Sequence, residues 1–491
     1  MSYLLGIDQG TTQTTAVVVD EGGRVVAQRS AQVPIRFPRA GWVEQDPWDI
    51  LRTVRETVTP LLEAYPIDAA GFDNQGETFL LWERATGQPV TPAIVWQDKR
   101  GQTVCDALRD RVAPNWLRAK TGLVLDTYFT APKLRQVFES DPALRARAWA
   151  DELCFGTTET WVLWHLTGGR LHVTDPSTAC RTLLYDIQRL DWDDELLNLF
   201  DVPSAMLPMV LPSAGYAGDL DFGLDRPVPL HALVVDQQAA LFGQACFQPG
   251  EVKCTFGTGS FLLMNTGPQP QISRHGLLTT VAWQMAGEAA YALEGGIYVT
   301  GAAVQWLAEG LGLLPDVAAS AEAAAGAADT GVVFVPALAG LAAPHWRPEV
   351  GGAFFGLRRG TTPADLARAV LDGIACRVVE VVQAMEQDAG RFPTQLKVDG
   401  GPTGNAYLMQ RLADLLGLEV LVAEAREATA LGAAHLAGVS ALGLRLDELA
   451  ARWRAAAVYR PRLTAAAREA VMDRWRRAIA AVTVFHSDVS S

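Results

Sequence analysis

The chain alternates between short apolar runs and amphipathic stretches, and this pattern predicts an α/β protein. Apolar runs at about 3–9, 14–20 and 24–32 predict a three-stranded meander. Helical periodicity follows over about 46–64, where Asp46 is suited to cap the helix and Pro47 to its first turn. Strand and helix signals continue to alternate from Ile67 onward, as is typical of this class.

The strand pattern restarts at about residue 250, so the chain is expected to form two large domains. Helices are predicted near 300–312, 316–328, 363–386, 404–416 and 428–442, and a surface helix near 462–483. Gly243, Pro249 and Gly250 interrupt the pattern, which places the boundary within 243–251. We expect one domain over 1–246, a second over 247–445, and a helical extension over 446–491.

A strand, a glycine-threonine turn and a returning strand occur once in each half of the chain. The two turns are Gly10-Thr11-Thr12 and Gly257-Thr258-Gly259. Glycine lets an anion approach the backbone, where N–H groups and threonine hydroxyls can donate to phosphate oxygens. Two such turns facing each other across a cleft would hold a nucleotide triphosphate.

Composition and charge narrow the possible partners. The formal net charge of −14 argues against nucleic acid or an anionic membrane as the main partner. The six cysteines show no C-x-x-C spacing and suggest a reduced, cytoplasmic protein. We expect no signal peptide and no membrane-spanning segment. Scattered histidines such as His165 and His435 are expected to be packed or surface residues, not metal ligands.

Two aspartates stand at strand ends and allow two interpretations each. Asp8 precedes the first glycine-threonine turn and could cap that turn or act as a partner of Mg²⁺, and the adjoining turn favours the second role. Asp236 follows an apolar run and opens a helical segment. It could be an N-cap, or a base that takes a proton from an alcohol attacking phosphorus.

A third region, 399–405, places Gly400 and Gly401 after a short strand. The glycines would permit close approach to a flat ring or a phosphate, and an ordinary strand-to-helix turn explains them equally well.

These residues resemble the FGGY carbohydrate kinases, and most closely the members that phosphorylate glycerol. The resemblance covers about 3–445, and its more specific stretches are 41–47, 93–97, 236–244, 276–280 and 291–295. It implies an actin-like (ribonuclease H-like) fold, in which two α/β domains enclose a nucleotide cleft. It also implies ATP and Mg²⁺ as cofactors and leaves a homodimer or tetramer open.

The resemblance also implies a role for each matching residue. Asp236 would be the general base, and Asp8 would lie near the metal. The residues expected at the nucleotide are Thr11, Thr12, Gln13, Thr258, Gly301, Gln305, Gly401 and Asn405. Those expected at the polyol are Gly76, Glu77, Trp96, Tyr128, Asp236, Gln237 and Phe261.

Two positions depart from the glycerol-phosphorylating members. Gly76 stands where they carry an arginine immediately before the glutamate, and Thr15 where they usually carry one near the phosphates. A lost charge-assisted hydrogen bond is worth about 1.5–3 kcal/mol. Either water or a neighbouring side chain replaces the arginine and glycerol remains a poor-to-fair substrate, or a longer polyol fills the space that Gly76 leaves empty. A plain backbone turn with no selective role is the less favoured interpretation at this position.

The sequence therefore predicts an ATP-dependent kinase of a small polyol, with glycerol as the first candidate. A kinase of a tetritol, pentitol or ketopentose is the alternative that Gly76 suggests. A non-catalytic actin-like sensor of nucleotide or sugar is a remote second class, which the acid at position 236 and both turns disfavour.

Overall fold

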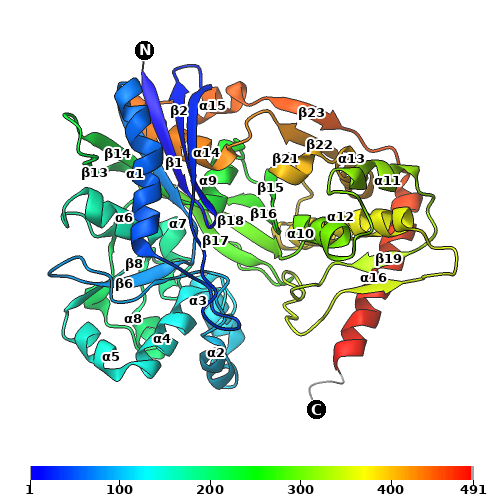
Figure 1. Ribbon diagram of the computed structural model, residues 1–491, viewed down its shortest axis with the longest axis horizontal. Helices are drawn as coiled ribbons and strands as arrows, with labels where there is room; N and C mark the ends of the chain where they lie inside the picture. The colour runs from blue at the N-terminus through cyan, green and yellow to red at the C-terminus, as the bar shows by residue number, and fades with distance from the viewer. Residues whose placement is uncertain (1, 488–491) are drawn as a thin grey trace.

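The protein, described here over residues 2–487 of a computed structural model, has two α/β halves (Figure 1). One 13-stranded sheet runs through both, in the order β23-β22-β21-β15-β16-β18-β17-β13-β14-β5-β1-β2-β3. The first half contributes β1 (Tyr3–Gln9), β2 (Gln13–Asp20), β3 (Val25–Gln32), β5 (Ile67–Asn74), β13 (Ala214–Leu220) and β14 (Val228–Val235). The second contributes β15 (Val252–Phe256), β16 (Ser260–Gly267), β17 (Leu278–Met285), β18 (Glu288–Ile297), β21 (Gln395–Asp399), β22 (Glu419–Ala423) and β23 (Ala455–Tyr459).

Smaller sheets flank this central one. A four-stranded sheet joins β4 (Glu44–Gln45), β7 (Ala93–Ile94), β6 (Phe79–Glu83) and β8 (Leu153–Thr157). Three strand pairs complete the set: β9 (Val173–Thr174) with β12 (Met209–Val210), β10 (Tyr185–Asp186) with β11 (Asp191–Trp192), and β19 (Val333–Val335) with β20 (Ala353–Phe355).

Helices cover the sheets in both halves. Those of the first half are α1 (Pro47–Ala64), α2 (Gln102–Arg109), α3 (Pro114–Thr121), α4 (Thr130–Ser140), α5 (Pro142–Trp149), α6 (Thr158–Leu166), α7 (Pro176–Ala179), α8 (Asp194–Phe200) and α9 (Asp236–Gly243). Those of the second are α10 (Gly301–Gln305), α11 (Ala319–Gly326), α12 (Pro363–Ala389), α13 (Ala406–Leu416), α14 (Ala428–Leu442), α15 (Leu446–Arg452) and α16 (Ala465–Ser487). Short 3₁₀ turns lie at Ser204–Met206 and Gly401–Gly404, and a π-helical turn at Trp306–Gly310.

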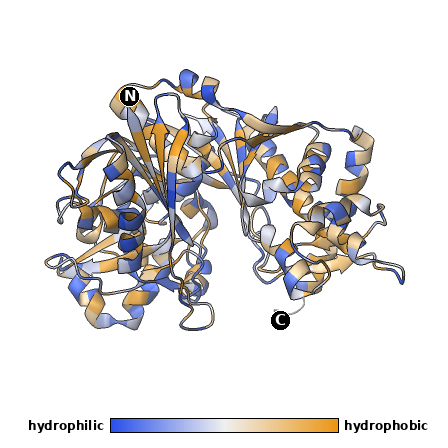
Figure 2. Cartoon of the chain, turned by 45° about the horizontal axis from the view of Figure 1, so that its top comes forward, coloured by the Kyte–Doolittle hydropathy of each residue, from blue (hydrophilic) through white to orange (hydrophobic). Residues whose placement is uncertain are grey.

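The meander and most predicted helices are confirmed. The Asp46 carboxylate caps α1 by accepting from the N–H of Trp48 at 3.0 Å, and Pro47 occupies the first turn. Helix α14 spans the predicted 428–442. Runs of buried aliphatic residues such as Val17, Val18 and Val19 form the interior, and Figure 2 shows hydrophobic residues along the central strands.

Three elements differ from the prediction. The helix expected over 300–312 is α10 followed by the π-helical turn, and the one expected over 316–328 is the shorter α11. The extension over 446–491, which we expected to be helical, also supplies β23. Its alanines favour a helix intrinsically, but the open edge of β22 offers backbone partners, and the two strands pair antiparallel.

Helix α14 returns from the second half to cover strands β1 and β5 of the first (Figure 1). It lies so close that a Cβ at Gly6 would stand 1.9 Å from the carbonyl oxygen of Ala430, and one at Gly71 would stand 2.0 Å from that of Ala433. These two glycines therefore let the helix seat directly on the sheet. Within residues 2–487, no helix has the length and apolar character needed to cross a membrane.

Candidate active site

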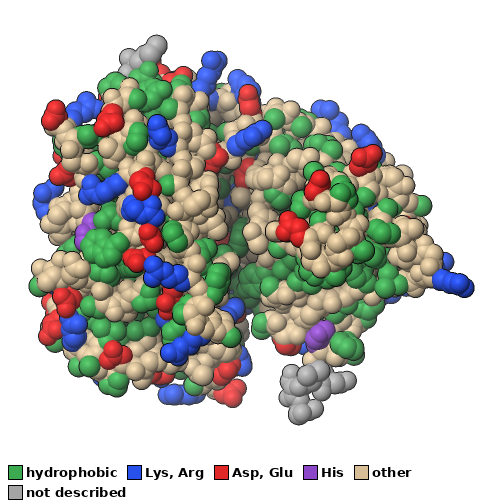
Figure 3. Space-filling model, viewed as in Figure 1, with side chains coloured by type: hydrophobic (Ala, Val, Ile, Leu, Met, Phe, Trp, Pro, Cys, Tyr) green, Lys and Arg blue, Asp and Glu red, His purple; other side chains and the backbone are tan. Residues whose placement is uncertain are grey.

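The two glycine-threonine turns face each other across a cavity of about 320 Å³ between the halves. The first turn joins β1 to β2 and the second joins β15 to β16. Thr11 and Thr12 line one side, and Gly257, Thr258 and Gly259 line the other. Figure 3 shows the hollow between the two halves. The predicted arrangement of two facing turns is confirmed.

The residues predicted for a polyol line this same cavity. Its lining includes Gly76, Glu77, Trp96, Tyr128, Asp236, Gln237 and Phe261. The ring of Trp96 meets Tyr128 at 5.6 Å and Phe261 at 6.3 Å between centroids, both nearly perpendicular. These edge-to-face contacts fix an apolar wall, and the carboxylates and the amide among the lining residues supply polar groups.

Asp236 is the first residue of α9, directly after β14. Its Oδ1 accepts from the N–H of Gln237 at 2.6 Å, and the N-cap position of the helix is taken by Val235. Burial raises the pKa of its carboxyl to about 6. A carboxylate with a pKa near neutral, at the wall of a cavity, can take a proton from a hydroxyl.

Asp8 does not line the cavity; it is half-buried and stands beside the fully buried Asp73. Asp8 on β1 lies in register with Asp73 on β5. Burial, and then the charge of Asp236, raise the pKa of Asp8 to about 7. Burial and the charges of Asp8 and Asp236 raise the pKa of Asp73 well above its ordinary value. Both oxygens of Asp73 are buried without a hydrogen-bond partner within residues 2–487.

No group of three or more His, Cys, Asp or Glu in the described chain is arranged to hold a metal ion. Both carboxyl oxygens of Asp73 beside Asp8 nevertheless lack a hydrogen-bond partner in the described chain. Mg²⁺ in phosphoryl-transfer sites is held by one or two carboxylates together with waters and substrate phosphates. The donor set at the cleft fits an ion of that kind, held mainly by the nucleotide.

A buried arginine that the sequence did not single out lies at the polyol side. The Arg181 guanidinium donates from Nε to Glu77 at 2.8 Å, and from Nη1 and Nη2 to Glu294 at 2.6 and 3.0 Å. Nη2 also lies 3.5 Å from the Tyr128 hydroxyl. Burial raises the pKa of Glu77, and the charge of Arg181 opposes that shift. Arg181 also lines the cavity.

The space beside Gly76 is narrower than expected on one side. A Cβ at this position would stand 3.1 Å from Cγ2 of Val235 and 3.8 Å from Cγ of Arg181. The first contact is tight and the second is ordinary, so Val235 restricts the space toward β14, while Gly76 still lines the cavity.

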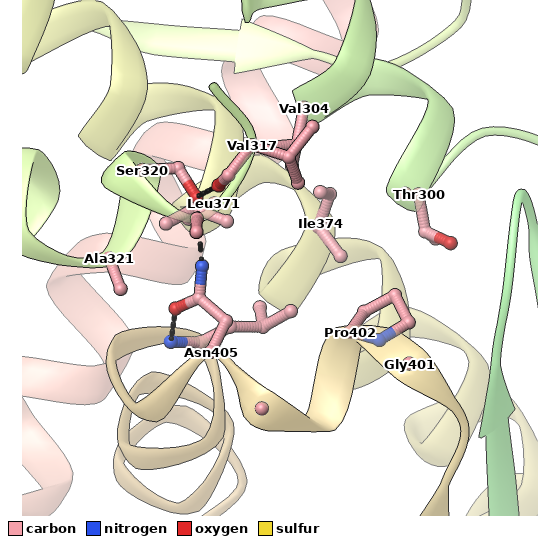
Figure 4. Close-up of a pocket in the computed structure, with 14 residues that line it drawn as sticks. Thr300, Val304, Val317, Ser320, Ala321, Leu371, Ile374, Gly401, Pro402 and Asn405 are labelled. Atoms are coloured by element: carbon pink, nitrogen blue, oxygen red, sulfur yellow. Dashed lines mark hydrogen bonds between the residues drawn. The ribbon is translucent and has the colours of Figure 1, made fainter. Parts of the chain in front are cut away.

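A second cavity, of about 500 Å³, lies in the second half beside α10 and α13 (Figure 4). The predicted nucleotide residues Gly301, Gly401 and Asn405 line it, among apolar side chains that include Val304 and Ile374. An apolar slot of this size with few polar groups suits a flat heterocycle. The Asn405 amide itself is engaged: its Oδ1 caps α13, and its Nδ2 donates to Ser320 at 3.1 Å.

The two glycines after β21 have different roles. Gly400 has a φ of +92°, and a Cβ there would stand 1.9 Å from the carbonyl oxygen of Phe256, so the chain path itself requires glycine. Gly401 has no atom near its Cβ position and opens onto the second cavity.

The two cavities adjoin at Gly301, whose N–H donates to the carbonyl of Gly257 at 3.1 Å. The second glycine-threonine turn thus contacts the wall of the second cavity. A ligand with a ring in one cavity and a phosphate chain toward the other would pass this contact.

Two further predicted residues lie away from both cavities. Gln13 bonds within the meander, donating to Thr15 at 3.0 Å and accepting from Gln32 at 3.1 Å. Gln305 is exposed and donates to Glu309 at 2.8 Å. Thr15 is buried and lies 3.1 Å from the Ser30 hydroxyl.

Sequence reasoning missed four residues that complete the site: Asp73, Arg181, Lys253 and Glu294. Lys253 donates to Oε1 of Gln237 at 2.6 Å, and the Gln237 side chain also bonds to the Asp236 carboxylate. A lysine inside the apolar strand β15 and a glutamate inside β18 were the available signals, since buried charges are rare unless paired.

Comparison with known proteins agrees with this geometry. The N-terminal domain of the FGGY family of carbohydrate kinases matches residues 3–243, and its C-terminal domain matches 252–441. The chain belongs to this family. It is 49% identical to glycerol kinase of Thermus brockianus and 48% identical to that of Aromatoleum aromaticum, in each case over 98% of both chains.

Solved structures show the same fold. Plasmodium falciparum glycerol kinase with ADP superposes with a TM-score of 0.92 at 32% identity, over 98% of both chains. Xylulose kinase of Lactobacillus acidophilus has a TM-score of 0.90 at 22% identity, which speaks to the fold alone. The predicted family, fold class and kinase activity are confirmed.

Proposed function

We propose that this chain catalyses the ATP-dependent phosphorylation of glycerol, forming glycerol 3-phosphate. The observation that carries the proposal is the position of Asp236. Its carboxylate lines the same cavity as both glycine-threonine turns. The aromatic side chains and the other carboxylate that would contact a polyol line that cavity too. The full-length similarity to glycerol kinases supports the same acceptor.

In this reaction the acceptor lies between Asp236 and the aromatic wall. Asp236 accepts the proton of the terminal hydroxyl as its oxygen attacks the γ-phosphorus and the bond to the β-phosphate oxygen breaks. The N–H groups and hydroxyls of the two turns donate to the phosphate oxygens, including those of the ADP that leaves. Mg²⁺, near Asp8 when bound, would neutralise phosphate charge.

The nucleotide is proposed to place its base in the second cavity and its phosphates at Thr258 and Thr11. The support is the contact between Gly301 and Gly257, which joins the two cavities. We assign the protein to the cytoplasm, because its six cysteines are all free and buried, as suits a reducing compartment.

The decisive assay measures ADP release with ATP and Mg²⁺ over glycerol, dihydroxyacetone, erythritol, threitol, xylitol and ketopentoses. Glycerol should give the highest kcat/KM, and phosphorus NMR should identify glycerol 3-phosphate. A tetritol, pentitol or ketopentose as the best acceptor would replace glycerol in the proposal. No ADP above the acceptor-free rate with any of them would reject polyol kinase activity.

A further inference from the structure

The corner formed by Gly76 and Val235 differs in character from the rest of the acceptor cavity. Val235 ends β14, where it lies in register with Asn74 of β5, so its side chain meets the loop that follows Asn74. The Cβ position of residue 76 is 3.1 Å from Cγ2 of Val235. That distance is below ordinary van der Waals contact, so the valine would have to give by a few tenths of an ångström to admit a Cβ at 76.

Arg181 supplies a guanidinium beside this corner. The side chain is 3% exposed, and the carboxylates of Glu77 and Glu294 hold it in place. An arginine has five N–H donors. Nε is bonded to Glu77, Nη2 faces Glu294 and Tyr128, and Nη1 gives one donor to Glu294. The second N–H of Nη1 has no protein acceptor among residues 2–487.

The side chains around Arg181 also keep hydrogen-bonding capacity that no protein group occupies. Oε1 of Glu77 accepts from Arg181, and its Oε2 accepts no hydrogen bond from the described residues. Gln237 accepts from Lys253 through Oε1, and its amide nitrogen donates one hydrogen to the Asp236 carboxylate and keeps the other. The cavity therefore presents a carboxylate acceptor and two N–H donors to a ligand, matching a polyol whose hydroxyls both donate and accept.

We propose that the Arg181 guanidinium binds the acceptor in this chain. We also propose that the Gly76–Val235 corner leaves no room for a second guanidinium from position 76. Arg181 and Glu77 together bind the hydroxyls that are not phosphorylated. The corner closes the space that additional carbons would need, which assigns the acceptor to three-carbon polyols. This inference rests on the proposed polyol kinase activity.

The first test combines a change in Arg181 with a change in the acceptor. Wild-type protein is assayed with glycerol and with propane-1,2-diol, which keeps a terminal hydroxyl and lacks one of the others. One charge-assisted hydrogen bond corresponds to a kcat/KM ratio of at least about tenfold. Arg181→Lys keeps the buried positive charge but loses the planar fork, so this ratio should fall at least about fivefold.

Arg411→Lys is the matched control, because Arg411 is another buried arginine paired with a carboxylate, Asp372 at 2.9 Å, and lines neither cavity. It should leave the acceptor ratio unchanged. A merely structural role for Arg181 would lower stability and activity but preserve the ratio. An unchanged ratio in a folded Arg181→Lys protein, with its KM for ATP as in wild type, overturns the assignment.

The second test is a double-mutant cycle at the corner, which does not depend on altering Arg181. Gly76→Arg alone should lower kcat/KM for glycerol at least about tenfold, since the side chain meets both Val235 and the Arg181 charge. Adding Val235→Gly should restore at least about fivefold of that loss. If the fold-losses in kcat/KM of the two single variants multiply to give that of the double variant, the two positions are not coupled and this part of the proposal is wrong.

Wild-type activity separates the two levels of the argument. Erythritol used as well as glycerol would overturn the three-carbon assignment while leaving the kinase activity standing. No turnover of any polyol would overturn the proposed function, and this inference with it.

Discussion

Trp96 donates its indole N–H to the hydroxyl oxygen of Thr11 at 2.9 Å. This hydrogen bond joins the aromatic wall of the acceptor cavity to the first phosphate turn. Because the Thr11 oxygen accepts from the indole, its own hydrogen remains free to donate to a phosphate oxygen. The two substrate regions therefore share one hydrogen-bonded link.

Removing that hydrogen bond should weaken the binding of both substrates. Trp96→Phe keeps an aromatic wall but loses the N–H, and a hydrogen bond is worth about 0.5–1.5 kcal/mol. We expect KM for both glycerol and ATP to rise by about two- to tenfold. Steady-state kinetics measure this, with Trp82→Phe as the control, because the indole N–H of Trp82 has no partner within residues 2–487. A rise in the glycerol KM alone would show that the link does not orient Thr11.

Asp236→Asn should abolish phosphoryl transfer and leave ATP binding largely intact. The amide keeps the shape of the side chain but cannot accept the hydroxyl proton, and general-base assistance contributes about 10²–10⁴-fold. Turnover and ATP affinity are measured separately, by ADP release and by calorimetry. Asp110→Asn, at an exposed position, is the matched control. Near-normal turnover in Asp236→Asn would remove it from the role of base.

The pKa of Asp236 predicts an acid limb in the pH dependence. The carboxyl, raised to about 6 by burial, is competent as a base only when ionised. Below that pH, kcat/KM should fall about tenfold per unit, and above it this group should impose no further rise. The measurement is kcat/KM against pH at saturating ATP. A flat profile from pH 7 down to 5 would contradict the assignment.

Gly301→Ala should selectively weaken the binding of the nucleotide. A methyl group there would stand 2.5 Å from the carbonyl oxygen of Gly257 and would push apart the contact that joins the two cavities. We expect KM for ATP to rise at least about tenfold, and KM for glycerol to stay within about twofold. Gly326→Ala, where no atom lies within 4 Å of the Cβ position, is the control. Equal effects of the two substitutions would show that this contact does not shape the nucleotide site.

Because His435 is buried with a lowered pKa, we expect the protein to lose stability on acidification. Its side chain is buried in α14, Nε2 has no partner within the described chain, and burial lowers its pKa to about 4. Between pH about 6.5 and 4 the unfolded chain binds a proton that the folded chain does not, so stability falls as pH falls. The loss reaches about 3 kcal/mol. His435→Leu should flatten the fall of the thermal midpoint between pH 6.5 and 4.5, and parallel curves would contradict this.

Most of the fold could be predicted because it rests on local signals. The Asp46 cap, the meander and the helix over 428–442 all follow from periodicity and capping residues. Strand β23 could not be predicted in this way, because its alanines favour a helix and only the neighbouring edge of β22 makes it a strand. The oligomeric state stays a prediction.

The site could be predicted where residues follow strand ends, as Asp236 and both turns do. Arg181, Glu294 and Asp73 carry no such signal, because contacts far apart in the sequence define their roles. The consequence of Gly76 depended on Val235, a residue that the sequence alone gave no reason to pair with it. The roles of the individual site residues remain predictions for the experiments above.

Arg181 bonds to Glu77 in the first half and to Glu294 on β18 in the second. Removing one partner of a buried ion pair of this kind costs about 3–5 kcal/mol, because the other charge is left buried without a partner. Arg181 therefore ties the two halves together at the acceptor end of the cleft. Any opening at this end of the cleft would have to separate the Arg181 guanidinium from the Glu294 carboxylate.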